Sequence, residues 1–303
     1  MNRPVAVIDC GTNSTRLLIT DGAGLAVREQ RITGLGRGMG AGRVLQPEAI
    51  DRVLAALSGY RQSLTDHGVT DCRAIATSAA RDATNRDDFF APAEEVLGHP
   101  LELLAGEDEA RYGFRGATAG LDKASAPWLV VDIGGGSTEF SFGSAEPHVH
   151  VSVPMGSVRF TEDYIPSDPP LPEELSAAIS VVHLYLDDIV REHPQVAEAS
   201  TMIAVAGTAT TIAAVEIGLD PYDPEVIDSF TLTRAAAEDV FRTLATESIE
   251  DRKWNPGLQP ERADVIVGGC CVLVAIMRHL DMDACLIRES DLLDGMAAQL
   301  LNG

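Results

Sequence analysis

A glycine-rich stretch between Leu129 and Gly143, LVVDIGGGSTEFSFG, constrains the fold of this chain more than any other segment. An apolar run leads to Asp132, three glycines follow, and two hydroxyl residues then precede a second acid, Glu139. Because glycine has no Cβ, such a turn lets backbone N–H groups approach an anion closely. A dinucleotide-binding or Walker-type loop would continue into a helix, but here the next residues alternate polar and apolar as in a strand. The stretch predicts two strands joined by a glycine turn whose tip can cradle a phosphate.

The same pattern occurs once before, from Val5 to Ile19, as VAVIDCGTNSTRLLI. Both copies follow D-x-G-x-x-S-T-x-apolar, and this match in register argues against two unrelated hairpins. A repeat at this separation predicts two similar domains, each of which offers a hairpin tip to a shared cleft. One aligned position differs, because Arg16 stands where the second copy has Glu139. One tip would therefore supply a cation, and the other an acid able to hold a metal.

Length and composition limit the alternatives. A chain of 303 residues with 45% hydrophobic residues is long enough for two cores. Its net charge of −23 argues against broad binding of nucleic acid or membrane surfaces. An anionic substrate then needs a local basic patch, a metal ion, or both. Five scattered cysteines without a Cys-x-x-Cys pair indicate neither a zinc site nor a disulfide framework. Together with the lack of a secretory or membrane-length apolar segment, this favours a reduced, cytoplasmic protein.

Hydrophobic periodicity predicts the remaining elements. We expect a three-stranded meander over residues 5–33 and another that ends with a strand over 148–153. Short strands are expected over 72–76, 101–104, 202–206 and 285–287. The expected helices cover about 47–67, 85–97, 172–192, 233–247, 262–277 and 291–301.

Three further segments carry candidate functional residues. Arg81 follows the end of a strand and is either an anion clamp or a helix-surface charge. Three acids, Glu107 to Glu109, begin a helix, and helix capping explains one or two of them; a third leaves room for a general base. Gly207 and Thr208 open another helix, whose free N–H groups could receive an anion, although this signal alone is weak.

Taken together, the chain resembles the exopolyphosphatase / guanosine pentaphosphate phosphohydrolase family, a branch of the acetate kinase, sugar kinase, Hsp70 and actin superfamily. The resemblance covers nearly the whole chain and is carried by VAVIDCGTNSTRLLI, ATSAARDATN, GEDEARYGFRG, VVDIGGGSTEFSFG, VPMGSVRFTE, AVAGTATT and ERADVIVGG. It implies an α/β fold with two actin-like (ribonuclease H-like) domains that flank an interdomain cleft, each with a mixed five-stranded sheet. Domain I would take residues 1–122 plus 290–303, and domain II residues 123–289.

The resemblance also implies roles for individual residues. Glu109 would polarise the attacking water, Arg81 would assist as a catalytic cation, and Asp132 and Glu139 would hold Mg²⁺ directly or through water. The implied phosphate-binding residues are Asn13, Ser14, Arg16, Gly134, Gly135, Gly136, Ser137, Gly207 and Thr208.

The function implied is exopolyphosphatase, which releases terminal phosphate from inorganic polyphosphate. We expect a preference for short chains, because the chain stops at Gly303 without the helical regions that extend some family members. The alternatives are a pppGpp 5′-phosphohydrolase, an ATP-dependent kinase or chaperone-like ATPase, and a non-enzymatic (p)ppGpp- or polyphosphate-binding regulator. Glu109 in its E-A-R segment argues against the kinase, and intact Glu109, Asp132 and Glu139 argue against the regulator. The family also implies a homodimer, and the net charge of −23 argues against a nucleic acid or membrane partner.

Overall fold

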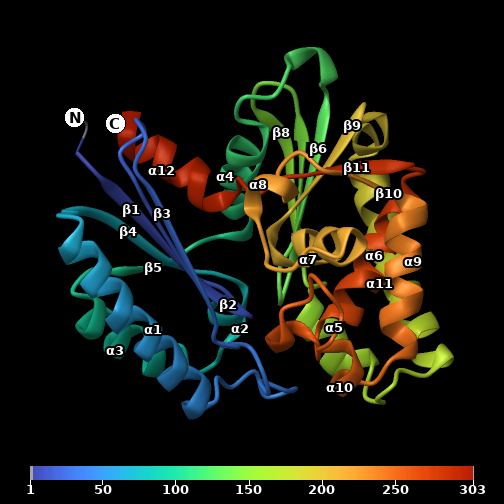
Figure 1. The fold of residues 1–303 in the computed structure, drawn as a ribbon, viewed down its shortest axis with the longest axis horizontal. Coiled ribbons are helices and arrows are strands. Elements are labelled where there is room, and N and C mark those ends of the chain that lie inside the picture. The colour runs from blue at the N-terminus through green and yellow to red at the C-terminus, as the bar shows by residue number, and fades with distance from the viewer. Residues whose placement is uncertain (1–2, 303) are drawn as a thin grey trace.

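Two mixed β-sheets stand side by side in the structure, a computed structural model that describes residues 3–302 (Figure 1). The first sheet has five strands in the order β3-β2-β1-β4-β5. The three strands of its antiparallel meander are β1 (Val5–Cys10), β2 (Ser14–Thr20) and β3 (Ala26–Ile32), and its two further strands, parallel to β1, are β4 (Asp71–Ala76) and β5 (Leu101–Leu103). This sheet has the five strands that the sequence predicts.

Strand β1 is buried along its whole length, so its alternate residues face two different cores. Ala6 and Ile8 pack toward α1 (Pro47–Asp66) and α3 (Asp87–Leu97). Val5 and Val7 pack toward the C-terminal helix α12 (Leu292–Asn302). The last segment of the chain therefore returns to the first sheet (Figure 1).

The second sheet has six strands in the order β10-β11-β9-β6-β7-β8. Its strands are β6 (Trp128–Ile133), β7 (Thr138–Gly143), β8 (Pro147–Val153), β9 (Thr201–Val205), β10 (Thr231–Thr233) and β11 (Ala284–Ile287). The expectation of five strands is wrong here, because β10 adds a sixth. A strand of three residues is too short to show the alternation on which sequence prediction depends.

Helices cover the second sheet on both faces. One face carries the large core around α11 (Ile266–His279), which is almost wholly buried. With it lie α5 (Ser157–Tyr164), α6 (Pro172–Glu192), α7 (Ala206–Ile217), α8 (Pro224–Ile227), α9 (Arg234–Thr246) and α10 (Ile249–Arg252). Helix α11 starts four residues later than the expected 262–277, because Pro260–Arg262 forms a separate 3-10 turn.

Helix α4 (Gly106–Thr118) lies between the two sheets. Its Tyr112 packs with the core shared by β1 and α12, whereas Phe114 and Ala117 pack against β6 and β9. We retain the division into domain I (1–122 plus 290–303) and domain II (123–289) as a proposal, with α4 as the element that contacts both sheets. Within residues 3–302, no helix has the length and apolar character needed to cross a membrane.

Candidate functional site

The two glycine turns have the same backbone geometry. The N–H of Gly11 donates to the carbonyl of Ser14 at 3.0 Å, and the N–H of Gly134 donates to the carbonyl of Ser137 at 3.1 Å. The flanking strands also share one register, with Asp9 opposite Arg16 in the first hairpin and Asp132 opposite Glu139 in the second. The repeat in the sequence is therefore a repeat in structure.

The two tips touch each other. A Cβ placed on Gly135 would lie 3.0 Å from the backbone nitrogen of Asn13, and one on Gly136 would lie 2.6 Å from Oγ of Ser78. Ser78 belongs to α2 (Ser78–Asp82), which follows β4. Glycine at both positions is what permits this approach, because any side chain would push the tips apart.

Between the tips lies a narrow cavity of about 60 Å³. The proposed residues that line it are Asn13, Ser14, Arg16, Glu109, Asp132, Gly134, Gly135, Gly136, Ser137, Gly207 and Thr208. In the described part of the chain, the backbone N–H groups of Gly135, Gly136 and Ser137 donate to no protein acceptor. The amide of Asn13 is buried with its Nδ2 unpaired. The cavity is thus walled by hydrogen-bond donors that still need acceptors.

Arg81 and Glu139 do not line the cavity but support it from behind. Arg81, on α2, donates to Glu109 Oε2 at 2.6 Å and lies 3.7 Å from Glu139 Oε1. Glu139 also accepts hydrogen bonds from the hydroxyls of Ser137 at 2.7 Å and Ser152 at 2.6 Å. One guanidinium therefore holds two buried carboxylates in place.

The three acids at the start of α4 lie in different environments, two at the surface and one at the cavity. Glu107 is exposed, Asp108 pairs with Arg111 on the surface, and Glu109 is buried at the cavity. Burial and the charge of Glu139 raise the pKa of Glu109 well above its usual range, against the lowering effect of Arg81. Such a carboxyl suits proton transfer near neutral pH.

Asp132 is 8% exposed and lines the cavity, and no side-chain hydrogen bond or ion pair to it is present among residues 3–302. Burial, aided by the charge of Asp291, raises its pKa to about 8. Burial and the charge of Asp132 raise the pKa of Glu139 to about 7. The raised pKa values mean that the positive charge near Asp132 and Glu139 does not fully neutralise the two carboxylates.

Two site residues, Asp9 and Asp291, were missed by the sequence reasoning. Arg16 donates to Asp9 at 2.7 Å and also pairs with Asp291, which follows β11 at the far end of the sequence. Asp9 could have been found, because it aligns with Asp132 in the repeat. Asp291 lies 275 residues from Arg16 and carries no local signal.

The donor set fits a divalent cation with hard oxygen ligands. Oδ1 of Asp9 is buried with no partner, and the unpaired carboxylate of Asp132 lines the same cavity. Among the described residues, no group of three or more His, Cys, Asp and Glu side chains could hold a metal by itself. Two carboxylates are a donor set that Mg²⁺ accepts, because this ion completes its shell with water and phosphate oxygens.

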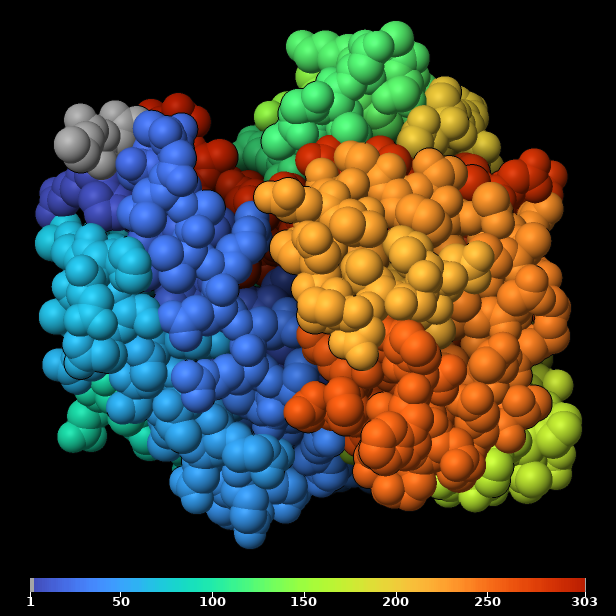
Figure 2. Space-filling view, viewed as in Figure 1, coloured from blue at the N-terminus to red at the C-terminus, as the bar shows by residue number. Residues whose placement is uncertain are grey.

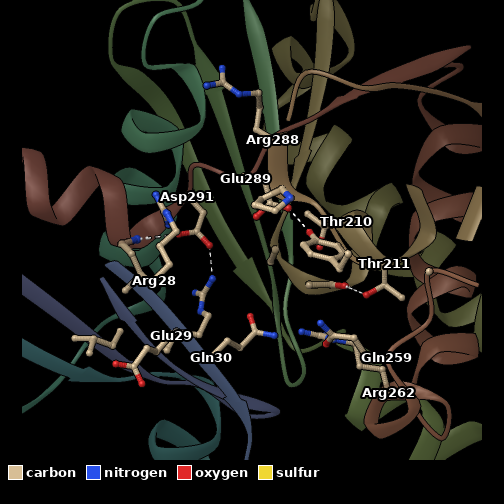
Figure 3. Close-up of a pocket in the computed structure, with 18 residues that line it drawn as sticks. Arg28, Glu29, Gln30, Thr210, Thr211, Gln259, Arg262, Arg288, Glu289 and Asp291 are labelled. Atoms are coloured by element: carbon tan, nitrogen blue, oxygen red, sulfur yellow. Dashed lines mark hydrogen bonds and ion pairs between the residues drawn. The ribbon is translucent and has the colours of Figure 1, made fainter. Parts of the chain in front are cut away.

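A second cavity, of about 270 Å³, lies beside the first, and Figure 3 shows the side chains that line it. Both cavities are lined by Arg16, Gln30, Gly207 and Arg262. In Figure 3, Gln30 from β3 faces Gln259 and Arg262 across the space. Figure 2 shows a groove between the half of the molecule that contains the first sheet, in blue, and the orange segments of the other half.

Arg262 was also missed as a site residue. Its side chain is buried against Gly207, and its Nε donates a hydrogen bond to Oε1 of Gln259 at 3.0 Å. Within residues 3–302, Arg262 forms no ion pair. Burial lowers its pKa to about 10. An unpaired buried guanidinium at the junction of two cavities is suited to a phosphate group.

Comparison with known proteins places the chain among relatives over its whole length. A sequence model of the Ppx/GppA phosphatase family matches residues 7–302. "Exopolyphosphatase 2" of Mycobacterium tuberculosis is 42% identical, with 98% of both chains covered. "Guanosine-5′-triphosphate,3′-diphosphate pyrophosphatase" of Vibrio vulnificus is 30% identical over 99% of this chain and 60% of that protein.

One solved structure, described as an exopolyphosphatase-like protein, superposes with a TM-score of 0.93 at 32% identity and covers 99% of each chain. The predicted α/β fold with two halves, each built on a mixed β-sheet, is confirmed, and it is the fold of the Ppx/GppA family.

Proposed function

Because the chain belongs to the Ppx/GppA phosphatase family, we propose that it is an exopolyphosphatase, which hydrolyses the terminal phosphate of inorganic polyphosphate. The observation that carries this proposal is the convergence on one cavity of unpaired backbone donors from the second tip, an unpaired amide from the first, and the buried carboxyl of Glu109. Phosphoryl transfer needs positioning and charge neutralisation more than covalent chemistry, and these are what such a cavity supplies.

Glu109 acts as the general base in this proposal. Arg81 occupies its Oε2, which leaves Oε1 free to accept a proton from water. The water oxygen attacks the terminal phosphorus, its proton passes to Glu109, and the bridging P–O bond breaks toward the shortened chain. Arg81 is then a positioning residue that fixes the base.

Asp132 and Glu139 would hold Mg²⁺, directly or through water, with Asp9 as a further neighbour. The ion would neutralise charge on the phosphate oxygens when bound. Oε1 of Glu139 accepts the hydrogen bonds from Ser137 and Ser152, which leaves Oε2 for the ion or for a water on it.

The other proposed residues bind phosphate oxygens. The second tip contributes Gly134, Gly135, Gly136 and Ser137. The first tip contributes Asn13 and Ser14, and the N-terminus of α7 contributes Gly207 and Thr208. Arg16 lines the cavity while it is paired with Asp9 and Asp291, so it adds little free charge. Arg262 is the better-placed cation for the second phosphate.

The experiment is a phosphate-release assay on tripolyphosphate, pppGpp and ATP, side by side. Glu109→Gln is expected to lower kcat about 10²- to 10⁴-fold, the usual contribution of a general base. Glu107→Gln, exposed on the same helix turn, is the matched control and is expected to match the wild type. Equal loss in both variants, or in neither, would contradict the assignment.

Short chains are the proposed substrates. The two cavities are small, and a net charge of −23 leaves the surface without a long basic track. Initial rates on narrow length fractions test this, and faster turnover of chains hundreds of units long would refute it.

A pppGpp 5′-phosphohydrolase is the second candidate. The 270 Å³ cavity beside the tips favours it, as does the name of the Vibrio vulnificus relative. The ratio of kcat/KM for pppGpp to that for tripolyphosphate separates the two. Binding of either compound without phosphate release would instead indicate a regulator.

A further inference from the structure

The connection between β3 and α1 is held against the first hairpin tip. The N–H of Gly34 donates to the carbonyl of Asn13 at 2.9 Å, and the N–H of Gly36 donates to the carbonyl of Thr12 at 2.9 Å. A Cβ on Gly36 would overlap Cγ2 of Thr12, so glycine is what lets the connection come this close. The start of this connection therefore fixes the backbone of both turn residues of the first tip.

Arg37 extends from this connection to the half of the molecule that contains the second sheet. Its Nη1 lies 2.9 Å from Oδ2 of Asp264, and its Nη2 lies 3.2 Å from Oδ1 of the same carboxylate and 2.9 Å from the carbonyl of Glu261. These partners lie on either side of Arg262, at the end of the 3-10 turn Pro260–Arg262. Arg37 thus bridges the two halves beside the tips.

The same guanidinium reaches the side chain of Asn13. Nη2 of Arg37 lies 3.3 Å from Oδ1 of Asn13. Because a guanidinium has donors and no acceptor, the amide atom that it faces must be the oxygen. The other atom of the amide, Nδ2, is buried with no acceptor among the described residues. Asn13 lines the 60 Å³ cavity, so Arg37 leaves Nδ2 as the atom that this amide offers to a ligand there.

Folding alone gives little reason for this placement of Arg37. The side chains of Arg37 and Asp264 are 33% and 38% exposed, and such ion pairs contribute little to stability. Nε of Arg37 is buried with no acceptor in the described part of the chain, which costs free energy. Arg37 lines neither the 60 Å³ nor the 270 Å³ cavity. Any effect of Arg37 on a ligand therefore passes through a residue that does.

We propose that Arg37 is a positioning residue, which turns the Asn13 amide so that Nδ2 donates to a phosphate oxygen, and that Asp264 holds Arg37 in place from the opposite half. This inference rests on the proposed function for the presence of phosphate in the cavity. Without Arg37 the amide is free to turn its oxygen toward the phosphate, and the two oxygens repel each other. A contact that spans both halves of the molecule thus sets the donor of the first tip.

The chemistry of the side chain at position 37 provides the first test. Arg37→Lys keeps a group that only donates, whereas Arg37→Gln both donates and accepts, so it no longer selects the amide oxygen. Binding of tripolyphosphate with Mg²⁺ is measured by calorimetry in a Glu109→Gln background, which slows turnover. Arg37→Gln is expected to raise the Kd about tenfold, the lower end of the loss when the partner that orients a ligating side chain is removed. Arg37→Lys is expected to recover most of the affinity.

A double-mutant cycle with Asn13→Ala provides the second test, in the same background. Once the amide is absent, Arg37→Gln is expected to leave the Kd unchanged, because the residue through which Arg37 acts is gone. Asp264→Ala is expected to raise the Kd when Asn13 is present and to have no effect when it is absent. Arg43→Gln is the matched control on the same connection, because the Arg43 side chain is 56% exposed and pairs with Asp82 at 3.6 Å. We expect its Kd to equal that of Glu109→Gln alone.

An equal rise of the Kd in Arg37→Gln with and without the Asn13 amide would overturn the inference, since Arg37 would then act as a charge near the site. An unchanged Kd in Arg37→Gln, or the same Kd in Arg37→Lys and Arg37→Gln, would also overturn it. The proposed function fails by a different result, the absence of phosphate release from tripolyphosphate by the wild type, and the binding cycle does not depend on that release.

Discussion

In the first hairpin Asp9 faces Arg16 across the strands, whereas in the second Asp132 faces Glu139 at the same register position. The turns close with the same hydrogen bond. They differ in the two turn residues, Thr12 and Asn13 against Gly135 and Gly136, and in the charge of the facing pair. The first tip contains its own counter-charge and shares it with Asp291. The second places two acids together, and among residues 3–302 their one ion pair is that of Glu139 with Arg81.

This difference gives the two tips different charge balances. A buried ion pair carries its own neutralising charge, whereas each of two facing buried carboxyls raises the free-energy cost of ionising the other until a cation neutralises them. The first tip therefore combines a complete ion pair with its proposed phosphate contacts, and the second tip is incomplete without a cation. Substitutions in the two tips are expected to affect different properties.

The largest effect is expected at the first tip, on stability. Arg16→Met leaves the buried carboxyls of Asp9 and Asp291 without their cation, which is expected to lower the free energy of unfolding by about 3–5 kcal/mol. Chemical denaturation measures it. Arg28→Met is the control, because Arg28 also pairs with α12, through Asp294, but is 41% exposed. That exposed pair is expected to contribute about 0–1 kcal/mol. Equal losses would remove the distinction between the tips.

At the second tip the expected loss is in activity. Asp132→Asn removes one of two facing acids, and kcat/KM is expected to fall about 10²- to 10³-fold, as when one stabilising group of a transition state is lost. Without Mg²⁺, and above about pH 8 where the Asp132 carboxyl is ionised, the variant is expected to unfold at a higher temperature than the wild type, because a largely buried, unpartnered carboxylate is gone.

Mg²⁺ provides the second readout for Asp132→Asn. At about one hundred times its Kd, the ion is expected to stabilise the wild type by about 2.7 kcal/mol and the variant by much less. Asp163→Asn, at an exposed acid of α5, controls for loss of a surface charge. An undiminished thermal shift with Mg²⁺ would place the metal elsewhere.

The comparison also shows how far the sequence could lead. The two tips, their register and the charge difference between Arg16 and Glu139 were predictable, because hairpins are local and their residues repeat in order. Glu109 was separable from its neighbours only once the helix was oriented, since Glu107 and Asp108 have the same charge and the same cap preference.

Asp291 and Arg262 could not be predicted as site residues. Each reaches the cleft from a segment remote in sequence from the tips, through packing of α12 and through the 3-10 turn before α11. The strand β10 was missed for a different reason, because three residues paired to β11 leave no periodic signature. Local patterns identified the hairpins, and tertiary packing determined which charges meet.

The smallest expected effect concerns the contact between the tips. In Gly136→Ala the new methyl would lie 2.6 Å from Oγ of Ser78 and 2.7 Å from Oγ1 of Thr12, so the tips must separate. Overpacking of this kind is expected to cost about 1–3 kcal/mol of stability, together with a fall in kcat, because donors from the two tips no longer converge. Gly42→Ala is the control, since its methyl would meet only Cγ2 of Val44, at 3.8 Å. If Gly136→Ala kept full activity and stability, the two tips would be shown to act independently, and the shared cavity would lose its role in holding the phosphate.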